Sequence, residues 1–313
     1  MTDVLSDVLD LVEVRGVLTG GFAARGRWVS HGTVSKPLKL IALVSGSATL
    51  DVDGPGGPTG PVQLAGGDVV LLNGRTWLEL RGGGEGSVRE LVPEAGFDAM
   101  TLEGADLGSD DILVGGWFQV NGAGSSLLGA ALPAVLHVHA ERPTAGRVAL
   151  IVERLFDEAL HGRIGSGFAI RQNAQLLLLE MLRAYLEQEQ PPAGWLGLLA
   201  DESLRPALRL IHERPSRRWS LVELAAAANM SRTTFADRFR GRAGTTPLAY
   251  LSQWRMLLAQ RALRDPSVRI GTLATDLGYS SDSAFSTAFK REIGTSPWRY
   301  SRAIRDSTRE AGR

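Results

Sequence analysis

Cysteine is absent from this chain of 313 residues, and so are long runs of apolar residues. Without cysteine the protein has no disulfide, no thiolate zinc ligand, no catalytic thiol and no thiol-based redox switch. No apolar run approaches the roughly 20 residues that a membrane-spanning helix needs, and the first ten residues are too acidic for a signal peptide. These absences predict a soluble cytoplasmic protein, and the length suffices for two domains.

Net charge is also absent from the chain as a whole, because 34 Lys and Arg balance 34 Asp and Glu. The balance hides an asymmetry between the two ends. Residues 201–313 carry 20 basic and 11 acidic side chains, and residues 1–200 carry 14 and 23, so the net charges are +9 and −9. A basic segment joined to an acidic one is typical of a nucleic-acid-binding module attached to a different domain. From charge alone, a basic surface without a partner remains an alternative.

A helix-turn-helix pattern that starts at Ser220 recurs near Arg269, with an offset of 49 to 50 residues. Each copy predicts a short apolar helix, a tight turn and a second helix, over Leu221–Ala228 and Arg232–Ala243 in the first copy and over Ile270–Leu277 and Asp282–Ile293 in the second. Ser231 can cap one of these second helices, and Ser280 or Ser281 the other. The opposite face of each second helix is then available to a ligand outside the protein.

Phenylalanine recurs at the same two positions of each second helix, four residues apart, at Phe235 and Phe239 and at Phe285 and Phe289. This spacing places each pair on one side of its helix, where we expect it to form core. After the first copy, a helix from Pro247 to about Arg264 has a predicted length of roughly 25 Å, which suits a rigid spacer between two recognition helices. An ordinary helical bundle is the alternative, but it does not account for the duplication together with the charge.

The duplicated pattern resembles the DNA-binding domain of AraC/XylS-type transcriptional regulators. The resemblance covers about the last hundred residues and rests on these motifs: Leu224-Ala225, Ser231-Arg232-Thr233-Thr234-Phe235, Gly244-Thr245-Thr246-Pro247, Trp254-Arg255-Met256, Gly278-Tyr279, Phe289-Lys290 and Ser296-Pro297. It implies that one protomer places two recognition helices in successive major grooves of double-stranded promoter DNA. It also implies a homodimer, and an activator that recruits RNA polymerase.

The resemblance assigns groove-facing and phosphate-facing positions to both recognition helices. They are Arg232, Thr233, Ala236, Asp237, Arg240 and Arg242 in the first helix, and Asp282, Ser283, Ser286, Thr287, Lys290 and Arg291 in the second. Arginine favours guanine, serine and threonine are permissive, and alanine contacts a thymine methyl group. The cations that lie late in each helix, at Arg240, Arg242, Lys290 and Arg291, are expected to bind phosphates and to position the protein.

Two charged residues leave alternatives open. Asp237 either forms an intramolecular pair with Arg238 or Arg240, or accepts a hydrogen bond from cytosine N4. Arg255 either contacts a phosphate or forms a salt bridge within the domain.

The N-terminal two thirds predicts an all-β barrel or sandwich. Short β-rich runs separated by Gly and Pro turns cover Leu40–Val44, Ala48–Val52, Val69–Leu72 and Trp77–Leu80, with a loop at 54–58. Leu43-Val44-Ser45-Gly46 and the run from Gly66 to Gly74 resemble a cupin barrel of the kind found before AraC-type DNA-binding domains. The predicted fold class is two-domain α+β, with an N-terminal cupin-like β-barrel with accessory helices and a C-terminal all-α double helix-turn-helix domain.

Histidine is placed differently from the pattern of metal-dependent cupins, which group histidines and a glutamate around two glycine-bearing hairpins. Here Ser45 and Arg75 stand near the corresponding positions, so no site with three histidines forms there. His137 and His139 would point to one face of a strand, but we expect no third ligand near them. His31 is interpreted as a polar surface or pocket residue. The sequence therefore predicts no metal, no cofactor and no catalytic residue.

A small-molecule effector would fit the barrel interior best, with Trp28, Arg75 and Trp77 as candidate contacts. Packing is the alternative role for each of these three side chains.

Two helical stretches, Thr144 to His161 and Phe168 to Gln188, follow the barrel. The second has a broad apolar stripe, which packs against the barrel and can also serve a dimer interface. The predicted organisation is a cupin-like sensor and dimerisation domain at 1–189, a linker at 190–197 and a DNA-binding domain at 198–313, with helix-turn-helix units at 219–246 and 268–296.

The sequence thus predicts a sequence-specific transcription regulator, in the form of an activator that responds to a small molecule or another signal. Two alternatives remain. One is a metal-dependent cupin enzyme that a basic domain tethers to DNA, and the other is a regulator whose N-terminal domain only dimerises.

Overall fold

The computed structural model describes residues 3–53, 60–84, 87–90, 106–108, 110–140, 145–188 and 194–311. The chain divides into two units. The sheet unit comprises residues 13–191, and the helical unit comprises residues 1–12 together with 192–313. The loop predicted at 54–58 and residues 190–193 of the predicted linker lie outside the described residues.

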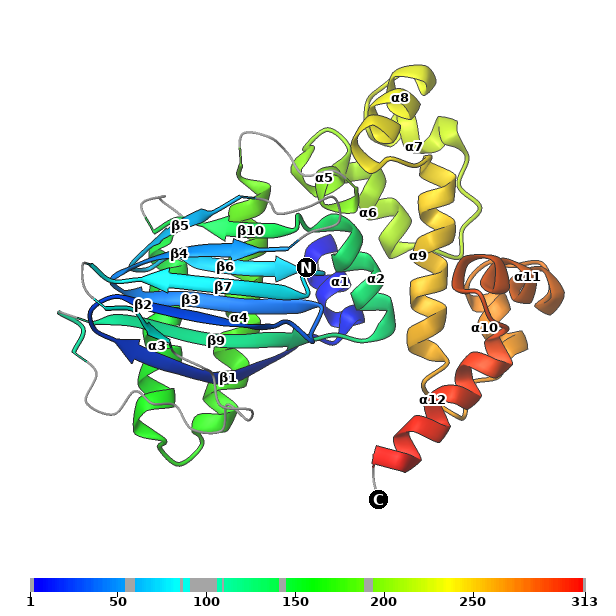
Figure 1. The fold of residues 1–313 in the computed structure, drawn as a ribbon. Coiled ribbons are helices and arrows are strands. Elements are labelled where there is room, and N and C mark those ends of the chain that lie inside the picture. The colour runs from blue at the N-terminus through cyan, green and yellow to red at the C-terminus, as the bar shows by residue number, and fades with distance from the viewer. Residues whose placement is uncertain are drawn as a thin grey trace. The chain divides into compact units, whose positions relative to one another are not determined.

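Two five-stranded sheets form the described part of the sheet unit (Figure 1). The first sheet has the order β1 (Arg15–Ala24), β9 (Asp111–Gln119), β3 (Leu38–Ser45), β6 (Val69–Asn73) and β10 (Val135–Val138). The second has the order β5 (Val62–Ala65), β4 (Ser47–Val52), β7 (Trp77–Gly82), β2 (Trp28–Thr33) and β8 (Arg89–Glu90). Neighbouring strands are antiparallel, except that β2 and β8 are parallel. The predicted β-rich cupin fold is confirmed.

The core of the sheet unit is apolar and takes side chains from both sheets. In strand β4, for example, the buried residues Ala48, Leu50 and Val52 alternate with more exposed ones, so one side of the strand faces the core. Leu43 and Leu50 are fully buried in this core, one from each sheet. The alternation of side chains along a strand therefore decides which residues enter the core.

In the part of the sheet unit that the structure describes, three helices accompany the sheets: α2 (Gly122–Ala131), α3 (Ala145–His161) and α4 (Ser166–Leu186). Helix α4 packs against α3 and against β1, and its buried side chains include Ala174, Leu177 and Met181. Most of the predicted apolar stripe of this helix is thus core, whereas Leu176 of the stripe is exposed. Other apolar side chains of α3 and α4 remain exposed, among them Leu150 and Phe168.

The helical unit contains α1 (Val4–Val12), α5 (Trp195–Ala200), α6 (Arg205–Glu213), α7 (Leu221–Ala227), α8 (Arg232–Ala243), α9 (Pro247–Ala262), α10 (Ile270–Asp276), α11 (Asp282–Ile293) and α12 (Pro297–Ala311). Helix α9 runs between the two helix-turn-helix copies (Figure 1). Nowhere in the described part of the chain is a helix both long enough and apolar enough to cross a membrane.

Two features of the helical unit differ from the predicted domain boundaries. Helix α1, predicted within the first domain, packs against α6 and α9 and buries Val8, Leu11 and Val12. Helix α5 starts at Trp195, inside the predicted linker, and buries that indole. Both segments are apolar enough to become core, which is the physical reason that they join the helical unit.

Candidate nucleic-acid interface

The two helix-turn-helix copies have the same turn. In the first copy the Met230 N–H donates to the Ala225 carbonyl at 2.9 Å, and in the second the Tyr279 N–H donates to the Ala274 carbonyl at 2.9 Å. These hydrogen bonds join equivalent positions, 49 residues apart in sequence. The repeat that the sequence predicts is therefore also a repeat of backbone geometry.

One residue in each turn has a left-handed backbone conformation, Asn229 with φ of 53° and Gly278 with φ of 80°. Asparagine is one of the few residues that tolerate this region, and glycine adopts it without a steric penalty. Gly278 has a second requirement. A β-carbon at this position would lie 2.0 Å from the carbonyl oxygen of Ser216, so only glycine allows the second turn to approach the loop before α7.

A serine caps each recognition helix. The Ser231 hydroxyl accepts a hydrogen bond from the Thr234 N–H at 3.2 Å, and the Ser281 hydroxyl accepts one from the Ala284 N–H at 3.1 Å. Of the two candidates in the second copy, Ser281 is the cap. Each cap sets the residue at which its helix begins, and so fixes which side chains follow in the first turn.

The buried faces of α8 and α11 are also equivalent. The rings of Phe235 and Phe239 are 5.7 Å apart at 56°, and those of Phe285 and Phe289 are 5.8 Å apart at 54°. A tyrosine of the following helix contacts each pair, with ring distances of 5.7 Å for Phe239–Tyr250 and 5.5 Å for Phe289–Tyr300. All four phenylalanines are fully buried, as predicted. This shared core orients both recognition helices in the same way.

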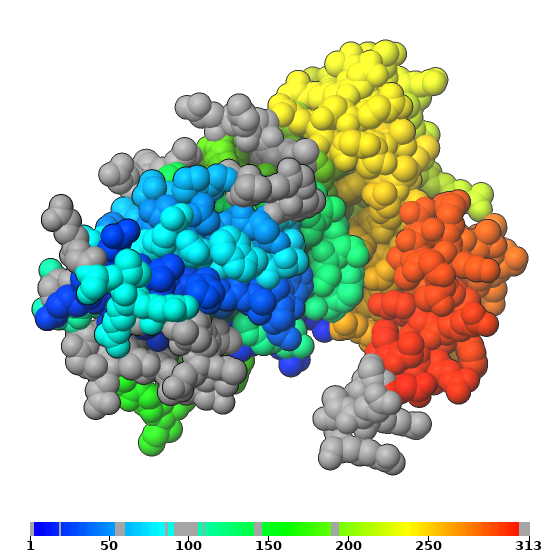
Figure 2. Space-filling model, in the orientation of Figure 1, coloured from blue at the N-terminus to red at the C-terminus, as the bar shows by residue number. Residues whose placement is uncertain are grey.

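The opposite faces of α8 and α11 carry most of the predicted contact residues. Those that are exposed are Arg232, Thr233, Asp237 and Arg240 on α8, and Asp282, Ser283, Thr287, Lys290 and Arg291 on α11. Ala236 and Ser286 are partly buried. In the space-filling view the two copies form separate lobes, yellow for α8 and orange to red for α11 and α12 (Figure 2). Each lobe thus offers one polar helix face to solvent.

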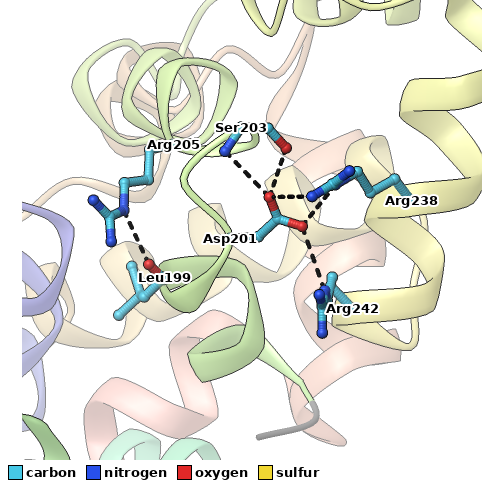
Figure 3. Close-up of polar contacts among 6 residues, drawn as sticks. All are labelled: Leu199, Asp201, Ser203, Arg205, Arg238 and Arg242. Carbon is cyan, nitrogen blue, oxygen red and sulfur yellow. Dashed lines mark hydrogen bonds and ion pairs between the residues drawn. The ribbon is translucent and has the colours of Figure 1, made fainter. Parts of the chain in front are cut away.

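Arg238 and Arg242 of α8 both turn toward Asp201, which lies between α5 and α6 (Figure 3). Arg238 donates to the Asp201 carboxylate at 2.7 and 3.1 Å, and the Arg242 Nε lies 3.4 Å from it. Sequence reasoning missed Asp201. The predicted pairing of Asp237 with Arg238 is wrong, because Asp201 holds that guanidinium, and within the described residues Asp237 has no ion pair with Arg240 either.

Asp201 is a buried, ionised carboxylate that pairs with two arginines of α8. Its side chain is 1% exposed, and burial by itself would raise its pKa. Hydrogen bonds from Arg238 and Ser203 outweigh burial and lower the pKa of Asp201 to about 2. Arg242, predicted to bind phosphate, is partly buried beside this carboxylate and has a structural role here.

Arg255 of α9 donates hydrogen bonds to two backbone carbonyls, that of Pro215 at 2.6 Å and that of Arg217 at 3.0 Å. The predicted alternatives were a phosphate contact and a salt bridge. Among the described residues Arg255 forms no salt bridge, because its guanidinium binds carbonyls in the loop before α7. The phosphate contact stays a prediction.

The three predicted effector contacts do not come together. Trp28 is buried in the core and donates to Asp111 at 2.7 Å, whereas Trp77 lies at the other end of the β2–β7 pair and is 38% exposed. Arg75 is buried and donates to the carbonyls of Asn73 and Asp53 at 3.1 and 2.7 Å. These residues do not share one site in the structure, since strand alternation turns Trp77 outward and Arg75 donates to backbone carbonyls.

A cavity of about 250 Å³ opens instead on the second sheet. Its lining includes Arg27, Trp28, Thr49, Gln63 and Arg81. Only Trp28 among the three predicted contacts reaches it. The polar and cationic lining favours a polar or anionic small molecule.

Asp68 lies beside His137 of β10 and His139, which directly follows that strand. Its Oδ2 is 2.9 Å from the His137 Nε2, so the expectation that no third ligand lies near this pair is wrong. Burial would raise the pKa of Asp68, but backbone N–H groups of Ala65 and Ala140 and the His137 ring hold it below its usual value. Burial lowers the pKa of His137.

Comparison with known proteins agrees with this architecture. The cupin family model matches residues 3–187, and the helix-turn-helix domain model matches residues 224–303. A Streptomyces lividans protein named as an AraC-like transcription regulator is 35% identical over 304 residues, which are 95% of this chain and 97% of that one. The HTH-type transcriptional regulator AlkR of Acinetobacter baylyi is 30% identical over 95% of this chain and 98% of its own length.

Among solved structures, the DNA-binding domain of AdpA in complex with a target DNA is 34% identical, and the match covers 34% of this chain and 96% of that one, with a TM-score of 0.33. A cupin unit joined to a duplicated helix-turn-helix unit defines a DNA-binding transcription regulator. More specifically, the chain belongs to the AraC-like transcription regulators.

Proposed function

We propose that the protein is a sequence-specific transcription activator, acting in the cytoplasm, that binds double-stranded promoter DNA through α8 and α11. The observation that carries this proposal is the equivalence of the two helices. Each has a serine cap, a buried phenylalanine pair and an opposite face with exposed polar side chains. Two equivalent helix-turn-helix units suit two successive major grooves.

The exposed residues divide into two groups by chemistry. Thr233, Ser283 and Asp237 lie in the first turns or the middle of the helices and read base edges. Lys290 and Arg240 lie in the last turns and bind phosphates. Because Arg238 pairs with Asp201, we assign Asp237 the other role that the sequence left open, which is to accept a hydrogen bond from cytosine N4.

Selection of bound sequences from a random double-stranded DNA library tests these roles in the full-length protein. Thr233→Ala and Ser283→Ala are expected to change base preference at discrete positions. Lys290→Ala is expected to weaken binding to all sequences alike and to reduce the slope of log K against log salt by about 0.9, because one phosphate contact is lost. Arg205→Ala, which removes an exposed cation of α6, is the matched control and leaves the slope unchanged.

The outcome that contradicts this assignment is equal, sequence-independent weakening by all three variants. Uniform weak binding of the wild-type protein to every sequence would contradict sequence-specific recognition itself. Footprinting at two salt concentrations on DNA around the protein's own gene then gives the operator, and transcription with purified RNA polymerase gives the sign of regulation.

The proposed oligomer is a homodimer formed through α3 and α4. Apolar side chains on these helices and the turn between them are exposed, namely Leu150, Leu160, Ile164, Phe168 and Leu176. We propose that the same face of a second copy of the chain packs against these side chains with two-fold symmetry and buries them. Phe168→Glu is expected to give monomers in light scattering after size-exclusion chromatography, and Leu107→Glu, an exposed apolar site elsewhere in the sheet unit, is not. Monomeric wild-type protein would refute this interface.

The sheet unit is proposed to receive a small-molecule signal and to have no enzymatic activity. The cavity lined by Arg27, Gln63 and Arg81 supports a polar or anionic effector. A ligand that binds only the folded state raises the melting temperature, so a thermal-shift screen of small metabolites is the test. Arg81→Ala should abolish such a shift. If no compound stabilises the protein, the alternative of a domain that only dimerises replaces this proposal.

A further inference from the structure

Asp68, His137 and His139 form a cluster at one end of β6 and β10. One ligand atom from each residue lies within 4.8 Å of the other two, and the imidazole rings are 3.8 Å apart at 41°. Exposure rises across the cluster, since Asp68 is buried, His137 is partly buried and His139 is exposed. The cluster is therefore open to solvent on the side of His139.

The strands bring these residues together. His137 and His139 are two residues apart at the end of β10, which places both rings on one face. Strand β10 pairs antiparallel with β6, with Val138 opposite Val69, so the residue that precedes β6 lies beside the end of β10. This residue is Asp68.

The backbone around Asp68 fixes its carboxylate. The Ala65 N–H donates to Oδ2 at 3.0 Å and the Ala140 N–H donates to Oδ1 at 2.7 Å. Gly67 allows the approach of the segment that holds Ala140, because it has φ of 89° and a β-carbon there would lie 2.9 Å from the Ala140 β-carbon. Outer hydrogen bonds of this kind orient a carboxylate ligand before a metal binds.

A purely structural role explains part of the cluster. The hydrogen bonds to Asp68 tie the β5–β6 turn to the end of β10 and account for Asp68 and His137. They do not involve the His139 ring, whose contact within the described residues is the neighbouring imidazole. Two imidazoles 3.8 Å apart beside a buried carboxylate, with one of them exposed, are better explained as a ligand set.

We propose that Asp68, His137 and His139 bind a divalent first-row transition ion, with Zn²⁺ as the best match. Two imidazole nitrogens and one carboxylate oxygen are a usual protein ligand set for this ion. Tetrahedral zinc with bonds of about 2.0–2.1 Å separates its ligand atoms by about 3.3 Å. The Asp68–His137 pair is already at 2.9 Å, and a rotation of the exposed His139 ring brings in the third ligand.

Binding requires one change of tautomer and leaves one position open. The His137 Nε2 coordinates the ion in its deprotonated form, with the ring proton on Nδ1, and the hydrogen bond to Asp68 is replaced by shared coordination. With three ligands from the chain, the fourth position faces solvent beside His139 and takes water or an anion. This proposal goes beyond DNA binding and does not depend on it.

Isothermal titration of the full-length protein, prepared without a histidine tag, with Zn²⁺ is the test. One ion per chain is expected, with at least 10-fold weaker binding in His139→Gln. His139 is exposed, so this variant keeps its fold, whereas Asp68→Asn would also disturb the turn. His161→Gln removes another exposed histidine of the sheet unit and is the matched control, expected to bind like the wild type.

A second readout is the melting temperature, which Zn²⁺ should raise in the wild type and in His161→Gln but not in His139→Gln. Three results overturn the proposal: no binding by the wild type, equal binding by the wild type and His139→Gln, or equal weakening by His139→Gln and His161→Gln. The last result would identify general surface binding to histidine.

Discussion

Replacing Asp201 by asparagine should weaken the attachment of α8 to the segment between α5 and α6. The substitution keeps the shape of the side chain and removes its charge. It leaves Arg238 and Arg242 without their anion and weakens the hydrogen bonds that Ser203 donates. Because these arginines belong to the first recognition helix, the effect is expected in the helical unit.

The magnitude follows from the pKa of Asp201, lowered from 3.8 to about 2. A shift of this size corresponds to about 2.5 kcal/mol. The side chains of Arg238 and Arg242 are 47% and 39% exposed, so solvent screening reduces the expected loss to about 1–2 kcal/mol. Since the folded-state pKa lies below the unfolded value of about 3.9, this stabilisation is complete above about pH 5 and disappears as the pH falls through 4 toward 2.

Hydrogen–deuterium exchange of α8 peptides in the full-length protein, measured across a urea series, reports the free energy of opening. Asp237→Asn is the matched control, because Asp237 is an exposed carboxylate on the same helix without a pair to Arg238 or Arg240 among the described residues. The reasoning is refuted if Asp201→Asn opens as rarely as Asp237→Asn at pH 7. A difference between the two variants that grows toward acidic pH would refute it equally.

Four further substitutions test the packing of the helical unit by urea unfolding of the full chain. Phe239→Ala and Phe289→Ala should each destabilise it by about 3–5 kcal/mol, since both rings are fully buried, and an unchanged unfolding curve for either would show that its ring is not core. Leu11→Ala should cost about 2–5 kcal/mol in this unit rather than in the sheet unit, because α1 packs against α6 and α9. Faster hydrogen exchange of sheet-unit amides alone would place α1 elsewhere. Gly278→Ala should destabilise by more than about 1–2 kcal/mol, from the left-handed backbone and the contact with the Ser216 carbonyl, whereas a neutral result would mean that the loop before α7 moves freely.

The sequence determined the features that depend on neighbours along the chain. The repeat, the cap at Ser231 and the phenylalanine spacing follow from helical periodicity and from capping, which act over a few residues. For the second cap the sequence offered Ser280 or Ser281, and the structure identifies Ser281. Alternation in residues 38–80 likewise predicted β3, β4, β6 and β7, although it missed β5, which has only four residues.

Tertiary structure alone decided which distant residues meet. Asp201 and Arg238 are 37 residues apart, and Asp68 and His137 are 69 apart, yet each pair is in hydrogen-bond contact. Helix α1 joins a unit that otherwise starts near residue 192. Such pairings depend on strand order and helix packing over the whole unit, about which no local pattern carries information. For this reason the sequence identified the recognition helices and their polar faces, whereas only the fold revealed what holds Arg238 and Arg242 and which carboxylate accompanies the two histidines.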